Sequence, residues 1–357
     1  MKDTPILQFG TSRFLQAHVD LMISEALEGG QAAGPITVVQ SSGDASRSER
    51  LAALADPSGF PVRIRGLKDG QRIDVEKRVT SIRHAMSTAT DWDALCDLFD
   101  DEVRYVVSNT GDTGFDPQAS DTADRFDQSM SFPAKLRLLL RHRFRSGAAP
   151  ITIMPAELIS RNGDVLRDRV LEIAAGDAKP FRDWLAKDVI WTNSLVDRIV
   201  SAPIEPAGAI AEPYALWAIE AQQGLVPPCR HPDIDVVPSL ADVSAKKLFL
   251  LNLPHTLMAD RWLKEGRYAD ETVRDFLSHG AARDWLQDVM ATEVLPAFEN
   301  AGGNCYWQGC LERFDNPFLD HKLSDIAQNH SAKVDRRVRA FLNWSGRPCP
   351  TLAQAAQ

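Results

Sequence analysis

The sequence contains no long hydrophobic run: no apolar stretch among its 357 residues reaches the roughly 18 residues that a membrane-spanning helix needs. It also has no excess of basic residues. The net charge of −9 disfavours a nucleic-acid partner, because binding phosphates needs a basic surface. The apolar stretch near the N-terminus is too short for a secretory signal. The five cysteines are scattered and odd in number, which is typical of reduced thiols. We therefore expect a cytoplasmic protein that binds neither nucleic acid nor membrane.

Several motifs of catalytic sites are also missing. None of the eight histidines forms an HxxxH or HExxH pair, and Cys305 and Cys310 do not form a CxxC motif, so we expect no metal site. The GxSxG motif of serine hydrolases is absent as well. The composition itself is that of a globular protein, with 44% hydrophobic and 25% charged residues. The length suits two domains.

Short apolar runs alternate with helical patterns in the first half of the chain. Alternation of this kind predicts βαβ units, and hence an α/β fold with a parallel sheet covered by helices on both faces. After about residue 165, long amphipathic stretches dominate, interrupted by a Pro-rich stretch at 202–238 that we expect to be irregular. We therefore predict an N-terminal α/β domain, with bounds at 1–187, followed by a mostly helical domain at 188–357. The predicted strands and helices of the first half are 5–10, 14–27, 36–40, a hairpin at 62–75, 91–99, 103–107, 134–144 and 151–154.

The turn after the first predicted strand resembles a phosphate-binding loop, because glycine lets a pyrophosphate approach the N-terminus of the following helix. Only Gly10 of a GxGxxG pattern is present, and an ordinary tight turn is the alternative. The second strand ends in Gln40 rather than in the acidic residue that binds a ribose in NAD enzymes. Arg47 and Arg50 follow, so the sequence leaves NAD and NADP open. The predicted cofactor-binding residues are Gly10, Thr11, Ser12, Phe14, Gln40, Ser108, Asn109 and Thr110, although the last three also suit a plain polar loop.

A polar cluster interrupts an apolar helical segment in the second half. On an ideal helix, His255 lies about 80° and Asn252 about 140° around the axis from Lys247. Pro254 should distort the helix there, because it lacks a backbone donor. Each of these residues taken alone suits a solvated or a core position. Together they suit metal-free oxidation of a secondary alcohol, in which a desolvated lysine takes the hydroxyl proton and an amide steadies the developing alkoxide.

Two further segments carry candidate residues. Asn193 interrupts an apolar stretch that otherwise suits a connection between domains. Arg313 can clamp a carboxylate with two parallel hydrogen bonds or can simply hold a loop, and the sequence leaves both readings open.

Eight segments occur along the chain in the order ILQFGTSRFLQAHVD, VVSNTGDTG, FPAKL, PAELISRNG, NSLVDRIV, EPYALWAIE, KLFLLNLPH and ERFDNPFLDH. Together they resemble the polyol-specific long-chain dehydrogenase/reductase family, which includes mannitol dehydrogenase. The resemblance extends over nearly the whole chain and rests on the order of the segments and on the Lys-x4-Asn-x2-His spacing. Within the family, the tagaturonate reductase branch is the one most similar to ILQFG, PAELISRNG, LVDRIV and EPYALWAIE.

The resemblance implies a Rossmann-like first domain, a helical second domain, NAD as cofactor and no catalytic zinc. By position, Lys247 matches the family's catalytic lysine, Asn193 and Asn252 match oxyanion asparagines, and His255 matches a substrate-positioning histidine. Arg313 and His321 match positions near the far end of the substrate. The chain departs from the family at Ser12, Gln16 and Leu253-Pro254, which leaves the cofactor preference and the substrate size open.

We therefore expect an NAD(P)-dependent oxidoreductase that interconverts a sugar acid of the hexonate or hexuronate type, such as altronate or tagaturonate, with its keto form. A polyol or sugar-phosphate dehydrogenase is the alternative enzyme. A non-catalytic dinucleotide sensor is the alternative from another class. The sequence leaves monomer and homodimer open.

Overall fold

The computed structural model describes residues 4–111 and 113–357. The contacts between residues divide the chain into two compact units. The first unit comprises residues up to Arg63, together with Glu76–Ala211 and Ala215–Leu240, and the second comprises Ile64–Val75, Glu212–Tyr214 and Ala241–Gln357. Residues 188–240, which were predicted to begin the mostly helical domain, lie in the first unit except for Glu212–Tyr214.

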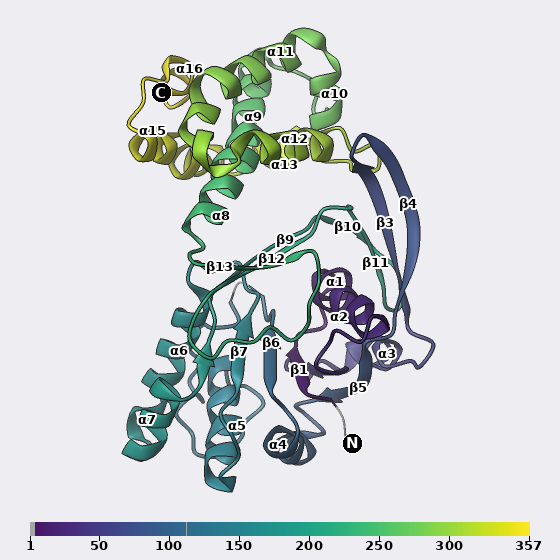
Figure 1. Cartoon of the computed structure of the whole chain (residues 1–357), viewed down its shortest axis with the longest axis vertical. Coiled ribbons are helices and arrows are strands. Elements are labelled where there is room, and N and C mark those ends of the chain that lie inside the picture. The colour runs from purple at the N-terminus through teal and green to yellow at the C-terminus, as the bar shows by residue number, and fades with distance from the viewer. Residues whose placement is uncertain (1–3, 112) are drawn as a thin grey trace. The chain divides into compact units, whose positions relative to one another are not determined.

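A six-stranded parallel sheet forms the centre of the first unit (Figure 1). Every neighbouring pair of its strands is parallel. The strand order reverses at β1, which lies between β2 and β6, and ligands of open α/β sheets bind at the carboxyl ends of strands at such a point. In order across the sheet, the strands are β5 (Ile82–Ser87), β2 (Ile36–Gln40), β1 (Ile6–Phe9), β6 (Tyr105–Ser108), β7 (Thr152–Pro155) and β8 (Ile190–Trp191).

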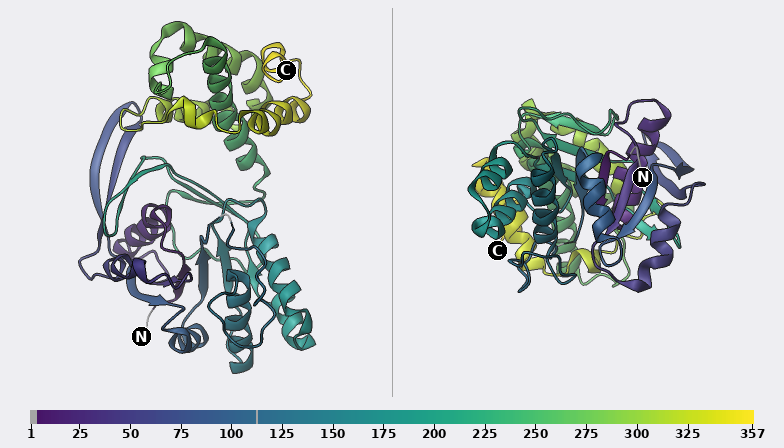
Figure 2. Two further views of the ribbon diagram at one scale, coloured as in Figure 1. Left: turned by 180° about the vertical axis from the view of Figure 1, so that it is seen from behind. Right: turned by 90° about the horizontal axis from the view of Figure 1, so that it is seen from below.

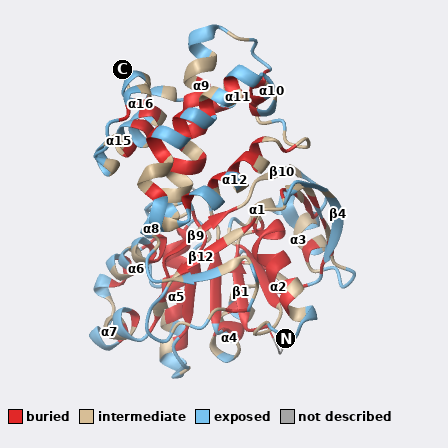
Figure 3. Ribbon diagram, turned by 45° about the horizontal axis from the view of Figure 1, so that its top comes forward, coloured by how far each residue is buried: buried red, intermediate tan, exposed pale blue. Residues whose placement is uncertain are grey.

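Both faces of this sheet are buried (Figure 3). Successive strand residues point to opposite faces, and Leu7, Phe9 and Val106 pack on one face in a core that includes residues of four helices. These helices are α4 (Trp92–Asp101), α5 (Phe132–Ser146), α6 (Asn162–Ile173) and α7 (Lys179–Lys187). Ile6 and Val107 point the other way and are also fully buried. The strands can therefore be apolar throughout, which explains why their runs were recognisable in the sequence.

Helices α5, α6 and α7 lie side by side (Figures 1 and 2). The ends of α5 have local causes. The Ser131 hydroxyl accepts a hydrogen bond from the Ala134 N–H, Pro133 lies in the first turn, and Gly147 ends the helix with a left-handed φ of 76°. The remaining helices of this unit are α1 (Arg13–Ala17), α2 (Val19–Glu28), α3 (Ser48–Leu54) and the short η1 (Ala45–Arg47) and η2 (Ala174–Gly176).

Two smaller sheets contain the other strands. The predicted hairpin is present as β3 (Phe60–Lys68) and β4 (Gln71–Val79), and it joins β10 (Val200–Pro203) and β11 (Ala209–Ala211) in a sheet ordered β10-β11-β3-β4. The second sheet has the order β13-β12-β9, from β9 (Ser194–Asp197), β12 (Leu216–Glu220) and β13 (Ile234–Val237). The expectation that 202–238 is irregular was therefore wrong. These strands are only three to five residues long and pair with distant segments, so no local periodicity revealed them.

The helices of the second unit surround one apolar core that includes Phe249, Leu257, Phe276, Trp307 and Phe341. Its first helix is continuous from α8 (Ala241–Lys246) through the π-helical η3 (Lys247–Asn252) to α9 (Leu253–Glu265). The other helices are α10 (Val273–Ser278), α11 (Gly280–Val289), η4 (Met290–Val294), η5 (Leu295–Ala301), α12 (Gly303–Phe314), α13 (Leu323–Ile326), α14 (His330–Lys333), η6 (Val334–Arg339), α15 (Ala340–Ser345) and α16 (Pro350–Ala355).

The predicted fold class is thereby confirmed: a Rossmann-like α/β unit comes first, and a mainly helical unit follows. Within the described residues, no helix combines the length and the apolar character that crossing a membrane would require.

Candidate active site

The turn between β1 and α1 brings together the polar residues that were predicted for a dinucleotide. Gly10 has a φ of 120°, and a Cβ atom there would lie 2.5 Å from the backbone oxygen of Asn109, so only glycine fits. Ser12 caps α1 by accepting a hydrogen bond from the Leu15 N–H, and its hydroxyl donates to Asn109 Oδ1 at 3.1 Å. Gly10, Ser12 and Asn109 thus meet where the strand order reverses.

The first helix itself is held from within the same unit. The Gln16 amide donates to the backbone oxygen of Thr11 at 3.2 Å, and Thr11 is buried. The ring of Phe14 stacks on His18 with a centroid distance of 4.7 Å. Gln16 accepts hydrogen bonds from Arg13 at 3.2 Å and from the Gly208 N–H at 2.7 Å. Gln16 therefore supports the loop structurally.

The end of β2 carries no carboxylate. The Gln40 side chain donates to the backbone oxygen of Asp44 at 2.7 Å and to the Ser42 hydroxyl at 3.2 Å, and so closes the loop that follows the strand. Asp44 lies in that exposed loop and forms an ion pair with Arg47 at 3.2 Å. The acid that would bind a ribose hydroxyl at the strand end is replaced by an amide.

A residue that the sequence analysis did not select organises the end of β6. Glu157 is 3% exposed and accepts hydrogen bonds from the Ser108 hydroxyl at 3.0 Å and from the Thr110 N–H and hydroxyl at 3.0 and 3.1 Å. Burial raises the pKa of this carboxyl. Glu157 therefore fixes the loop where Ser108 and Thr110 were predicted to contact the cofactor. Its only sequence signal was its place in the PAELISRNG segment.

Asn193 lies in the first unit, between β8 and β9, and is 7% exposed. Its amide nitrogen donates to a carboxylate oxygen of Asp164 and to one of Glu220, both at 2.9 Å. Its amide oxygen accepts from the Asp164 N–H at 3.1 Å. Both amide hydrogens are therefore engaged, and binding an oxyanion would require Asn193 to leave one of these carboxylates.

The helix that carries Lys247, Asn252 and His255 is distorted where Pro254 led us to expect it. Residues Lys247–Asn252 form a π-helix, Pro254 lies in the first turn of α9, and the Leu253 N–H bonds to the Leu248 oxygen. Hydrogen bonds of the i→i+5 type widen the turn, and π-helical turns are frequent at functional sites. Residues five apart then lie closer to one face than the 140° of an ideal helix, which brings Asn252 toward the face of Lys247.

The guanidinium group of Arg337 contacts the helical turn at Asn252. The Arg337 guanidinium donates to the backbone oxygen of Asn252 at 3.1 Å and to the Thr256 hydroxyl at 3.0 Å. The Thr256 hydroxyl donates in turn to the Asn252 oxygen at 3.2 Å. Arg337 and Thr256 therefore both donate to the backbone oxygen of Asn252 and hold this turn in place.

His255 is buried, 7% exposed, against the rings of Phe314 and His321 at centroid distances of 4.6 and 4.8 Å. Burial, aided by the nearby cationic side chains, holds the pKa of His255 well below its ordinary value, while a hydrogen bond with the Leu251 backbone acts in the opposite direction. The imidazole is therefore neutral. Its Nε2 is buried and has no hydrogen-bond partner in the described part of the chain, so it can serve a ligand hydroxyl.

The sequence left open whether Arg313 clamps a carboxylate or holds a loop, and in the structure it clamps a carboxylate of its own chain. Its Nε and Nη2 atoms lie 2.9 and 2.8 Å from the two carboxylate oxygens of Glu212. The side chains of Arg313 and Glu212 are 6% and 2% exposed, and the guanidinium lies 4.5 Å from the ring centroid of Tyr214. Glu212 was not selected from the sequence, although it opens the EPYALWAIE segment.

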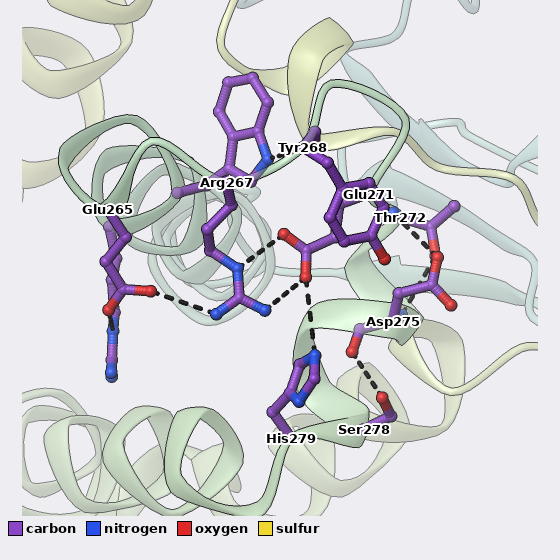
Figure 4. A network of polar contacts seen from close by, with 10 residues as sticks. Glu265, Arg267, Tyr268, Glu271, Thr272, Asp275, Ser278 and His279 are labelled. Atoms are coloured by element: carbon purple, nitrogen blue, oxygen red, sulfur yellow. Dashed lines mark hydrogen bonds and ion pairs between the residues drawn. The ribbon is translucent and has the colours of Figure 1, made fainter.

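Figure 4 shows a polar network around Glu271 and Thr272, and backbone hydrogen bonds join this part of the chain to the segment of His321. The Val273 N–H donates to the His321 oxygen, and the Leu323 N–H donates to the Glu271 oxygen, both at 2.9 Å. Glu271 is fully buried and is paired with Arg267. Burial lowers the pKa of His321. The structure thus places His321 beside His255 in the second unit, while the predicted cofactor residues lie in the first.

No group of three or more His, Cys, Asp and Glu side chains is arranged to hold a metal ion in residues 4–111 and 113–357. The five cysteines are free thiols.

The Rossmann-like sheet with a glycine turn at its reversal point defines a dinucleotide-binding oxidoreductase fold. Residues 4–227 match the mannitol dehydrogenase Rossmann domain, so the chain belongs to the mannitol dehydrogenase family and is a dehydrogenase acting on a CH–OH group. An altronate oxidoreductase of Bacillus subtilis (strain 168) is 30% identical over 93% of this chain and 73% of its own length.

Two solved structures share the fold. A substrate-free D-sorbitol dehydrogenase superimposes with a TM-score of 0.84 at 20% identity, covering 98% of this chain and 78% of its own. A mannitol 2-dehydrogenase of Pseudomonas fluorescens, in a ternary complex with NAD and D-mannitol, has a TM-score of 0.76 at 19% identity, covering 99% of this chain and 77% of its own.

Proposed function

We propose that the chain is an NAD(P)-dependent oxidoreductase that interconverts a sugar acid of the hexonate or hexuronate type, such as altronate and tagaturonate, with its keto form. The observation that carries the proposal is the irregular helix with Lys247, Asn252 and a neutral His255 whose Nε2 is buried without a partner among the described residues. The altronate oxidoreductase relatives, which match nearly the whole chain, support the substrate class.

The residues at the reversal point of the sheet fit a dinucleotide. Gly10 lets the chain turn closely against the backbone of Asn109, so that α1 begins beside the carboxyl end of β1, where the N–H groups at the start of a helix can bind a pyrophosphate. The loop that Glu157 fixes, with Ser108, Asn109 and Thr110, would hold the nicotinamide end. When bound, the cofactor supplies or accepts the hydride.

The chemistry at the substrate oxygen belongs to Lys247. In the reductive direction its ammonium group gives a proton to the carbonyl oxygen while the carbonyl carbon is reduced, and in the oxidative direction the amine takes the hydroxyl proton. The Asn252 amide donates a hydrogen bond to the same oxygen, and Asn193 does so once it leaves Asp164 or Glu220. His255 accepts a hydrogen bond from a neighbouring hydroxyl through Nε2.

His321 and Arg313 would contact the far end of the substrate. A carboxylate there would meet an Arg313 whose charge is already balanced by Glu212. This pairing favours a second candidate, a neutral polyol and its ketose, as the substrate of the same chemistry. A sugar phosphate would need further basic groups.

The experiment that separates these candidates follows the absorbance of NADH and NADPH during reduction of tagaturonate, fructuronate, fructose and fructose 6-phosphate. We expect kcat/KM for at least one keto sugar acid to exceed that for fructose by about tenfold or more, the discrimination that one charge-assisted contact provides. A preference for fructose would support the polyol candidate, and no turnover of any ketone would refute both.

A further inference from the structure

A buried lysine whose ammonium group lies at the carboxyl end of β2 has no anionic partner in contact among the described residues. Lys135, in the second turn of α5, is 3% exposed, and its ammonium group donates to a single acceptor in the described part of the chain, the backbone oxygen of Ser41 at 2.7 Å. An ammonium group has three donors. Burial of a cation without a paired anion is costly, and this cost lowers the pKa of Lys135 to about 8.

The two carboxylates whose charges act on Lys135 are committed to other partners. Asp121 accepts hydrogen bonds from the Ser131 N–H and hydroxyl at 2.8 and 2.9 Å and pairs with Arg169 at 2.8 Å. Asp127 accepts from the Ser129 N–H at 2.8 Å and from its hydroxyl. Both carboxylates favour a charged Lys135 from a distance, but neither forms an ion pair with it.

The ammonium group of Lys135 lies at the end of β2, where Rossmann folds bind the adenosine ribose. Ser41 directly follows β2, and an acid at this strand end binds the 2′-hydroxyl in NAD enzymes, whereas cations nearby accommodate a 2′-phosphate. Here the strand ends in Gln40, and Ser41 and Ser42 follow it. The exposed Asp44 is balanced by Arg47 at 3.2 Å.

The loop after β2 is held firmly in one conformation. The Ser41 oxygen accepts hydrogen bonds from the Gln128 amide at 2.8 Å and the Thr88 hydroxyl at 3.2 Å, in addition to the one from Lys135. Gly43 has a φ of 66°, and a Cβ atom there would lie 2.8 Å from the Gln128 amide nitrogen. Three donors and a glycine with a left-handed φ thus position this loop beside the lysine.

We propose that Lys135 is the cation that binds the 2′-phosphate of NADP(H), with the Ser41–Ser42 loop, so that the chain takes the phosphorylated dinucleotide in preference to NAD(H). The two remaining N–H donors of the ammonium group suit phosphate oxygens. This inference rests on the proposed dinucleotide function and specifies which cofactor the same site takes.

The test is isothermal titration of the full chain with NADPH, NADH and adenosine 2′,5′-bisphosphate, so that turnover is not needed. Lys135→Met removes the charge at similar length, Lys135→Arg retains it, and Lys187→Met, at an exposed position of α7, is the matched control. We expect Lys135→Met to weaken NADPH and bisphosphate binding by roughly 10- to 100-fold, as expected for a charge-assisted hydrogen bond. NADH binding should change by less than about threefold, which is below the effect of one ordinary hydrogen bond.

Lys135→Arg should retain most of the NADPH affinity, and the thermal midpoints of the variants should show that they are folded. Equal weakening of NADPH and NADH by Lys135→Met, or no weakening of either, would overturn the inference. Tighter binding of NADH than of NADPH by the unmodified chain would overturn it too, while leaving the proposed oxidoreductase function intact. Failure of all three nucleotides to bind would refute the proposed function itself.

Discussion

Replacing Asp20 by asparagine should make the stability of the chain less dependent on pH. Asp20 lies in α2, is fully buried, and neither of its carboxyl oxygens has a hydrogen-bond partner of normal geometry among the described residues. Burial raises the pKa of Asp20 to about 8, and the neighbouring Gln8 amide offsets only part of this effect. The folded chain therefore keeps a proton on Asp20 at neutral pH, whereas the unfolded chain releases it above about 3.8.

The size of the effect follows from this difference. Because the folded pKa is the higher one, the contribution of Asp20 to stability falls as the pH rises from about 4 to about 8 and is constant above that. At about 1.4 kcal/mol for each pH unit, a difference of about four units between the folded and unfolded pKa sets a ceiling of about 6 kcal/mol. Relaxation around a buried charge reduces this ceiling, so we expect at least about 2 kcal/mol. The asparagine side chain of the variant cannot ionise and therefore lacks this cost.

The assay is urea unfolding followed by tryptophan fluorescence and circular dichroism at pH 5, 6.5 and 8.5. The free energy of unfolding of Asp20→Asn minus that of the unmodified chain should rise by about 2–4 kcal/mol over this range, because about three pH units lie between pH 5 and the folded pKa of about 8. His18, whose pKa burial lowers to about 3, titrates alike in both chains and cancels in this difference. Asp284→Asn, at an exposed position, is the control and should give a flat difference. A flat difference for Asp20→Asn as well would refute the reasoning.

Three further substitutions test other contacts. Gly10→Ala places a Cβ atom 2.5 Å from the Asn109 oxygen, so it should cost more than about 2 kcal/mol of stability and weaken dinucleotide binding, as measured by urea unfolding and titration. Arg313→Leu leaves the Glu212 carboxylate buried without its cation and should lower the free energy of unfolding by about 3–5 kcal/mol. Changing both residues to leucine should recover much of this stability, and additive losses would contradict the pairing. The Glu293 carboxylate accepts hydrogen bonds from the first N–H groups of α16 at 2.9 and 3.0 Å, so Glu293→Ala should lower the stability by about 2 kcal/mol. Glu293→Gln should lower it by less, and hydrogen exchange of the α16 amides measures the loss of protection.

The parallel sheet was predictable because its strands are buried on both faces and therefore apolar without interruption. The segment 36–40 was predicted with the bounds that the structure has. The short strands after residue 202 could not be found in this way. They are specified by pairing with distant segments, as when Trp217 pairs with Val196 in one sheet, and no local pattern encodes such a partner.

The candidate site likewise contains some residues that could be predicted from the sequence and others that could not. Lys247, Asn252 and His255 could be grouped because they share one helix, and Pro254 indicated its distortion. Glu212 could not be joined to Arg313, because 101 residues separate them and only the tertiary fold brings the carboxylate to the guanidinium. The same holds for Glu157 and the β6 loop, since a buried acid accepting three hydrogen bonds carries no local signature.

The measurement that tests the central claim most directly is the steady-state reduction of tagaturonate by Lys247→Met, with dinucleotide binding titrated on the same preparation. If Lys247 moves the proton at the substrate oxygen, kcat should fall by about 10²–10⁴-fold, the usual contribution of a general acid or base, while the dinucleotide still binds with unchanged affinity. A variant that folds, binds the dinucleotide and turns over at nearly the normal rate would contradict the claim.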